Sequence, residues 1–303
     1  MSIRPVAHEA RAMPTTEGAG VHLHRAFGFA NPDQLDPFLL FDDFRNEDPR
    51  YYQRGFPWHP HRGIETITYV LTGEVEHGDS LGNRGTLKGG EVQWMTAGSG
   101  ILHQEMPKGS AKGQMHGFQL WANLPRDLKM TAPRYQDVKG RDIPEILEDD
   151  GTVIKVIVGH FAGKTGPVDG IAADPQYLDI FVPEGRRKTF RVDTYRRAFA
   201  YIFSGSGTFH DASRPRGVLL EKEVRGQEVN IRDMSGDRTL VQFGTGDEVT
   251  VQAGPDGIRF LLISGAPIQE PVAWHGPIVM NTQAEIQQAM AELRNGTFIR
   301  PAH

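Results

Sequence analysis

The chain has 303 residues, a formal net charge of −5 and a sequence pI near 6.2, and it contains no cysteine. This charge gives no general reason to expect binding to nucleic acid or to anionic membranes, and the lack of cysteine excludes disulfides, thiolate metal sites and cysteine nucleophiles. Plentiful glycine (35) and proline (20), with few long apolar-periodic stretches, favour an all-β architecture with many turns.

The N-terminal segment carries no apolar stretch of the kind found in secretory signals. No window approaches the roughly eighteen apolar residues that a membrane span needs, and the lack of disulfides fits a reducing compartment. We therefore expect a soluble, cytoplasmic protein that binds neither membrane nor nucleic acid, and we expect a monomer.

Short strand-like segments separated by glycine-rich turns fill the first half of the chain. The stretch 64–71 is rich in β-branched and aromatic residues, a strong strand signal, and further strands are predicted over 21–27, 37–44, 92–95 and 114–124. Strands of this length with a turn every ten or so residues indicate a sandwich or barrel.

A second series of strands follows a charged, proline-bearing stretch, at 153–158, 177–182 and 198–203. Its order of strand, turn, strand and Ser-Gly repeats that of the first half, which indicates a weak internal repeat of about 150 residues. We therefore predict two tandem all-β domains, over residues 1–135 and 143–303.

The end of the chain carries the clearest helix signal. Thr282 and Glu285 have the spacing of a capping box, an apolar stripe at i, i+3, i+4 and i+7 runs from Ile286 to Leu293, and Gly296 supplies the end. We predict a short C-terminal helix whose apolar face packs on protein surface.

Two pairs of candidate metal ligands have the spacing of neighbours on one face of a strand. One residue separates His59 from His61, and one residue separates His103 from Glu105. If the two strands are neighbours, three imidazoles and a carboxylate converge, a donor set that suits Fe, Ni, Co, Cu or Zn. We predict a divalent transition-metal site with these four ligands, which leaves the open positions of a catalytic ion.

Two other groups in the first half could bind a metal: the carboxylate of Glu65 and a second histidine pair. Glu65 also faces inward by parity with His61, but in a straight strand it would lie roughly 13 Å along the chain, so Glu105 is favoured. His22 and His24 form a second His-x-His pair, but no partner pair remains for them, and we expect no metal there.

The second half lacks a histidine pair at the corresponding place. Residues 182–188 offer one carboxylate, Glu184, among cations, so we predict no metal in this domain. The basic residues between Arg186 and Arg197 could dock an anion or a protein partner, although a solvated strand face is the simpler interpretation.

The metal pairs resemble the cupin signature. His59-x-His61 is followed three residues later by Glu65, with Gly73 one position late, and a glycine-rich turn precedes His103 as in the second cupin motif. More narrowly, six segments look like the pirin family. These segments are 59–66, 79–83, 92–98, 100–105, 117–121 and 276–282.

The pirin resemblance runs from about residue 15 to residue 300. It implies two tandem cupin barrels of jelly-roll type, with the metal only in the N-terminal one. The family's ligand set falls on His59, His61, His103 and Glu105. The implied metal is iron, with Ni, Co, Cu, Zn and Mn as alternatives.

In several members the resemblance also implies flavonol (quercetin) 2,3-dioxygenase activity. In that chemistry the flavonol enolate oxygen coordinates the metal, O2 adds across the heterocycle, and the ring opens with loss of CO. Glu105 would be the base that takes the flavonol proton. Phe56, Trp58, Trp94 and Met95 could line a planar aromatic pocket or belong to the core.

The resemblance allows two other functions. Eukaryotic pirins are metal-dependent co-regulators of transcription, so the chain could be a metal- or redox-sensing protein that acts through protein contacts. A cupin whose metal is only structural is the third interpretation, and it predicts unfolding on chelation. Oxygen-dependent consumption of a flavonol separates the enzyme from both.

Overall fold

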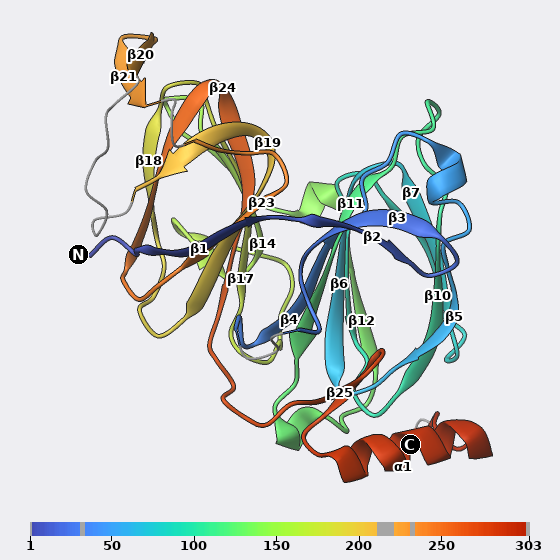
Figure 1. Cartoon of the computed structure of the whole chain (residues 1–303). Helices are drawn as coiled ribbons and strands as arrows, with labels where there is room; N and C mark the ends of the chain where they lie inside the picture. The colour runs from blue at the N-terminus through green and yellow to red at the C-terminus, as the bar shows by residue number, and fades with distance from the viewer. Residues whose placement is uncertain (1, 31–33, 211–220, 231–233, 301–303) are drawn as a thin grey trace. The chain divides into compact units, whose positions relative to one another are not determined.

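The computed structural model describes residues 2–30, 34–210, 221–230 and 234–300. Its regular structure over these residues is mainly β-sheet, with one α-helix near the C-terminus, α1 (Gln283–Asn295), as predicted (Figure 1). None of the helices in this part of the chain has the length and apolar composition that crossing a membrane requires.

The chain divides into two compact units. The N-terminal unit comprises Met13–Asp142 and Ile268–His303, and the C-terminal unit comprises Ile143–Pro267 and Met1–Ala12. We call residues 268–300 the tail.

Each unit therefore includes the opposite end of the chain, which differs from the predicted domains 1–135 and 143–303. β1 (Val6–Arg11) pairs antiparallel with β23 (Thr239–Phe243), and this pairing places the first residues in the C-terminal unit. Proximity along the chain predicts that each end joins the strands next to it, whereas backbone pairing places Val6–Arg11 in the C-terminal unit and packing places the tail in the N-terminal unit.

Two antiparallel sheets with facing inner surfaces form the N-terminal unit. The seven-stranded sheet has the order β12 (Arg134–Val138), β9 (Val92–Thr96), β6 (Ile64–Thr72), β11 (His116–Asn123), β4 (Phe38–Asp43), β3 (Val21–Phe27) and β2 (Met13–Glu17). The four-stranded sheet has the order β5 (Phe56–His61), β10 (Ile101–Pro107), β7 (Glu74–Asp79) and β8 (Arg84–Lys88). This is a jelly-roll arrangement of the cupin type, in which the two sheets face each other without closing into one continuous barrel.

The interior of the N-terminal unit has an apolar region at each end and a polar layer between them. Ile64 and Ile101 belong to one buried apolar cluster, and Val70 and Val75 belong to another. Thr68 lies between Ile64 and Val70 on β6 and is buried at 3% exposure. Because buried polar groups need hydrogen-bond partners, this middle layer is where a site can form.

One large sheet forms most of the C-terminal unit. Its order is β1, β23, β19 (Arg197–Phe209), β24 (Glu248–Gly265), β17 (Gln176–Val182), β14 (Val153–Val158) and β13 (Glu145–Leu147), with β18 (Arg187–Arg191) on β24 and β22 (Ser235–Gly236) on β19. Two short pairs complete it: β15 (His160–Phe161) with β16 (Lys164–Thr165), and β20 (Glu221–Val224) with β21 (Gln227–Asn230).

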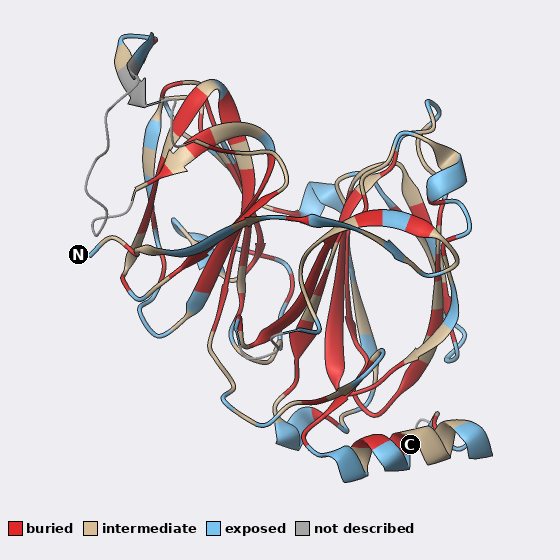
Figure 2. Cartoon of the chain, viewed as in Figure 1, coloured by how far each residue is buried: buried red, intermediate tan, exposed pale blue. Residues whose placement is uncertain are grey.

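The strands of this second unit are largely buried (Figure 2), and among the described residues an apolar cluster lies in its interior. Phe209 and Phe260 pack edge to face with ring centroids 5.4 Å apart, and Phe190 lies 6.0 Å from Phe260. The interior is therefore closed by aromatic packing, in contrast to the polar layer of the N-terminal unit.

Part of the basic segment between Arg186 and Arg197 is ion-paired within the C-terminal unit. Lys188 lies 3.0 Å from Asp150, and Arg196 lies 3.2 Å from Asp193. Two of the cations that could dock an anion or a protein partner are therefore paired within the unit. The binding of a partner at this segment stays a prediction.

The tail forms a hairpin, β25 (Ala273–His275) with β26 (Ile278–Met280), followed by α1. The predicted capping box is present: Thr282 N donates to Glu285 Oε2 at 2.8 Å, and Glu285 N donates to Thr282 Oγ1 at 3.3 Å. Ile286 packs with the hairpin in a buried cluster, and Gly296 ends the helix at φ 71°.

Arg62, the residue after His61, ties the tail to the N-terminal unit. Its guanidinium is 2% exposed and donates to Ser99 O at 2.7 Å and to Phe298 O at 3.0 Å. It also pairs with Glu292 of α1 at 2.6 Å. Such charge-assisted bonds are about twice as strong as neutral ones. Arg62 therefore stabilises the packing of the tail on the rest of the N-terminal unit.

Lys129 makes a second connection from the buried interior. Its Nζ donates to Asn123 Oδ1 at 2.7 Å and to Gly63 O and Val279 O at 3.0 Å. The backbones approach so closely here that a Cβ at Gly63, whose φ is +76°, would lie 2.0 Å from Val279 O. Glycine is therefore required at this turn.

We predict that Lys129→Met lowers the free energy of unfolding by about 2–3 kcal/mol, because three buried oxygens lose their donor. Chemical denaturation of the purified protein measures this. Lys139→Met is the matched control, since Lys139 is 47% exposed and pairs with Glu91 at the surface, and a change of about 0.5 kcal/mol or less is expected. Equal stability of the two variants would contradict the role given to Lys129.

Candidate metal centre

β5 carries two of the candidate ligands and lies at the edge of the four-stranded sheet. Pro57 and Pro60 are tolerated there because one side of an edge strand makes no ladder hydrogen bonds. β5 pairs with β10 so that His59 stands opposite His103, and the register shifts before Glu105. Neighbouring strands therefore carry both predicted ligand pairs.

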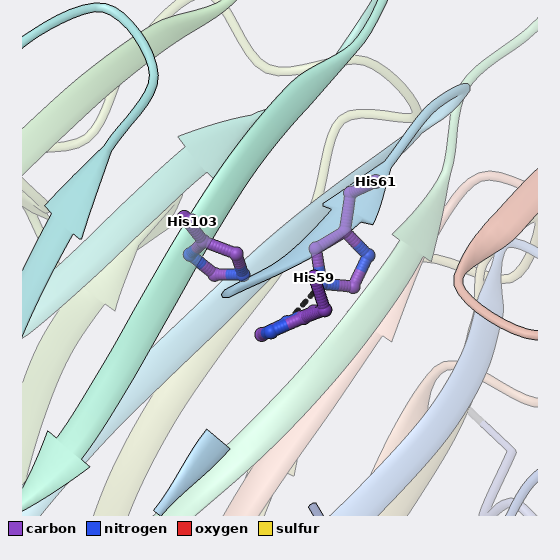
Figure 3. A group of neighbouring side chains, drawn as sticks. All are labelled: His59, His61 and His103. Atoms are coloured by element: carbon purple, nitrogen blue, oxygen red, sulfur yellow. Dashed lines mark hydrogen bonds between the residues drawn. The ribbon is translucent and has the colours of Figure 1, made fainter. Parts of the chain in front are cut away.

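The structure brings the three histidines together (Figure 3). Their ring centroids lie 4.4 to 4.9 Å apart, and one ring nitrogen of each lies within 4.8 Å of the others. Among the described residues, this group of mutually close ligand atoms contains His59, His61 and His103, and Glu105 is not part of it.

Backbone carbonyls set the tautomers of two of these rings. His59 Nδ1 donates to Pro57 O at 2.8 Å, and His61 Nδ1 donates to Pro277 O at 3.2 Å. In the neutral rings each Nε2 then carries a lone pair, and the two Nε2 atoms face each other at 3.0 Å. Both nitrogens of His103 are buried without a hydrogen-bond partner among the described residues. Facing lone pairs and an unpaired buried imidazole fit a bound cation.

Burial keeps these rings neutral. It lowers the pKa of His59, and it lowers the pKa of His61 and His103 well below the usual 6.5, with the neighbouring imidazoles adding to the effect. Neutral imidazole is the form that binds a metal. The cluster is therefore in its ligating state at neutral pH.

Glu105 lies two residues beyond His103 on β10 and is buried at 8% exposure. Thr68 Oγ1 of β6 donates to its Oε1 at 3.0 Å. Burial raises the pKa of Glu105 to about 7, and the hydrogen bond from Thr68 opposes this shift. A carboxyl group with such a pKa can exchange a proton near neutral pH.

The competing carboxylate, Glu65, does not face inward as we predicted. It lies on the face of β6 opposite to Thr68, where it accepts a hydrogen bond from Thr96 Oγ1 at 2.7 Å. β5 ends at His61, and Gly63, at φ +76°, turns the chain into the other sheet as β6, so Glu65 does not keep the parity of His61. Alternation cannot be carried across such a turn.

A cavity of about 450 Å³ opens beside the histidines. Its walls include His59, His61 and Glu105, together with Phe56 and Trp58 from the predicted aromatic set. Trp94 and Met95, the other two members of that set, are each 1% exposed and belong to the core. This is consistent with core packing, the alternative weighed for these residues.

Several wall residues had no signal in our reading of the sequence. Thr68 and Gln119 form the polar part of the inner wall, and Pro277 is contributed by the tail. Phe29 and Trp121 form an aromatic wall; the Trp121 ring lies edge-on to His61 with centroids 5.1 Å apart. Gln119, Trp121 and Pro277 lie in segments that resemble pirins, whereas Thr68 and Phe29 lie outside them.

The cavity wall also includes a charged group, formed by Arg25, Asp42 and Glu17. Arg25 forms a two-pronged pair with Asp42, both bonds at 2.8 Å, and also donates to Glu17 at 2.9 Å. Arg25 lies 5.2 Å from the ring centroid of Phe29. Apolar side chains, several of them aromatic, make up most of the cavity wall, with polar groups at defined places, which is typical of small-molecule sites.

Comparison with known proteins covers almost the whole chain. The family model Pirin matches residues 20–122, and the model described as Pirin C-terminal cupin domain matches residues 177–299. A pirin-like protein of Caulobacter vibrioides is 41% identical, over 98% of this chain and 100% of its own. The pirin of Mus musculus is 38% identical, over 92% of this chain and 89% of its own.

A solved structure agrees with these sequence matches. The crystal structure of a quercetin 2,3-dioxygenase from Acinetobacter baumannii is 30% identical and superposes with a TM-score of 0.84. The match covers 98% of this chain and 99% of that one. With both family models and relatives matched over nearly the full length, the chain belongs to the pirin family.

Proposed function

We propose that this protein is a metal-dependent dioxygenase that opens the heterocycle of flavonols such as quercetin. The observation that carries the proposal is the group of three neutral imidazoles, two of them with facing lone pairs, beside a mostly apolar cavity with several aromatic walls. The likeness to the Acinetobacter baumannii quercetin 2,3-dioxygenase supports the choice of substrate class. The co-substrate is O2.

The proposed ligands are His59, His61, His103 and Glu105, and the proposed metal is iron, with Ni, Co, Cu, Zn and Mn able to use the same donors. When bound there, the ion supplies Lewis acidity toward the flavonol oxygen and electron exchange toward O2. The buried rings hold it in a site screened from water, and Pro57 and Pro277 orient two of them.

Glu105 is the proposed base. Its carboxylate lies in the cavity wall, and it would take the proton from the 3-hydroxyl of a flavonol. Trp121 and Phe29 offer faces against which planar rings pack. Overall, flavonol and O2 give a ring-opened ester and CO, with both oxygen atoms of O2 retained in the products.

The ligand assignment predicts the metal content of variants. Purified protein should hold about one transition metal per chain, iron in protein from its native host. His103→Ala should lower occupancy at least tenfold, because each alanine removes one of a few donors. Elemental analysis measures this, and His22→Ala, on a ring that stacks on Tyr51 at 4.4 Å, should retain full metal. Full occupancy in His103→Ala would refute the site.

The pH dependence of metal binding tests Glu105 as a ligand. Burial raises its pKa to about 7, so below pH 7 the metal must displace a proton from this carboxyl. The pKa values of His61 and His103 lie lower, so they do not yet compete. Affinity measured by chelator competition should fall about fivefold between pH 7 and pH 6, and the fall should be absent in Glu105→Gln. The same slope in both proteins would exclude Glu105 as a ligand.

The activity itself predicts which compounds are consumed. Flavonols with a free 3-hydroxyl should be consumed with matching oxygen uptake, and flavones lacking that hydroxyl should be inert. Glu105→Gln should reduce kcat by about 10²-fold or more if it is the base. Consumption under strict anaerobiosis would refute a dioxygenase. A fully metallated protein that consumes no flavonol would favour the metal- or redox-sensing function.

A further inference from the structure

Thr68 connects the two sheets of the N-terminal unit at the centre of the proposed site. It projects from β6 of the seven-stranded sheet toward β10 of the four-stranded sheet, where its hydroxyl donates to Glu105 Oε1 at 3.0 Å. Both side chains line the cavity and both are buried, at 3% and 8% exposure. The hydroxyl therefore contacts the carboxylate directly, inside the unit.

Gln119 extends this contact to a third residue. It stands opposite Thr68 in the pairing of β11 with β6, and its amide oxygen Oε1 lies 2.8 Å from Thr68 Oγ1, as an acceptor of the same hydroxyl. A hydroxyl has one hydrogen and serves one acceptor. Both contacts are compatible when Gln119 turns its amide nitrogen toward Thr68, so that Gln119 donates to Thr68 and Thr68 donates to Glu105.

We propose that Thr68 is a positioning residue for Glu105, and that Gln119 directs the Thr68 hydroxyl. This rests on the proposed role of Glu105 at the metal. The hydroxyl holds one carboxylate oxygen against β6 and thereby fixes the plane of the carboxylate, leaving the other oxygen for the metal or the substrate proton. A carboxylate without this contact would rotate in the cavity, and misplacement of a reacting group lowers the rate strongly.

Three isosteric or near-isosteric variants separate the hydroxyl from packing. Thr68→Val keeps the branched shape and removes the hydroxyl, whereas Thr68→Ser keeps the hydroxyl and removes a methyl group. Thr66→Val is the matched control, because Thr66 lies on the same face of the same strand with the same 3% exposure. It does not line the cavity.

The first readout needs no turnover. Each variant is loaded with Co(II), and its visible absorption spectrum and Co(II) affinity are measured. Thr68→Val should change the spectrum and weaken binding about three- to tenfold, while Thr68→Ser and Thr66→Val should match the unaltered protein. Spectra and affinities that are the same in all four proteins would overturn the proposal.

The second readout is flavonol turnover in the fully metallated proteins. Thr68→Val should lower kcat by about 10- to 100-fold with little change in KM, and Thr68→Ser should restore it to within about threefold. An impaired Thr68→Ser beside an active Thr68→Val would assign Thr68 to packing and overturn the proposal. If the unaltered protein consumes no flavonol but Thr68→Val alone changes the Co(II) spectrum, the proposed function fails and the positioning of Glu105 stands.

Discussion

Two backbone carbonyls decide what the histidine cluster can be. By accepting from the Nδ1 atoms of His59 and His61, Pro57 O and Pro277 O leave both Nε2 lone pairs turned toward each other at 3.0 Å. That arrangement is unfavourable for the rings alone and favourable around a cation, as in metal sites where the second ring nitrogen donates to a carbonyl. The edge position of β5 and the anchoring of the tail through Arg62 both serve to place these carbonyls.

The two units show how one fold supports either a site or a core. In the C-terminal unit Phe190, Phe209 and Phe260 meet in the interior, within an apolar cluster of described residues. In the N-terminal unit the apolar residues form clusters at the two ends, and the middle holds polar side chains such as Thr68 and Glu105. Buried polar groups are costly unless they are paired, so such a layer is retained where hydrogen bonds and a ligand satisfy it.

Sequence reasoning succeeded where the contact is encoded by short spacing. Alternation along β5 and β10 predicted that the histidines share a face, and the capping box of Thr282 predicted the helix. It failed where geometry depends on distant segments. The turn at Gly63 reversed the parity argument for Glu65, and Pro277 lies 216 residues from the His61 ring that it orients. No local sequence pattern predicts a partner so distant in the chain. The exchange of chain ends between the units could not be predicted either, because it also depends on contacts between distant segments.

The parts of the centre therefore depend on different parts of the chain. The link from Thr68 to Glu105 forms within residues 13–142, because two sheets of one unit supply both groups. The orientation of His61 instead requires the tail, which also supplies part of the partners of two buried side chains: Phe298 O and Glu292 for Arg62, and Val279 O for Lys129. Without the tail Arg62 would lose Glu292, its ionic partner among the described residues, and a buried cation that loses its carboxylate is strongly destabilising, so residues 13–142 alone should not keep this arrangement. The metal centre is complete only when the chain has passed through the C-terminal unit and returned.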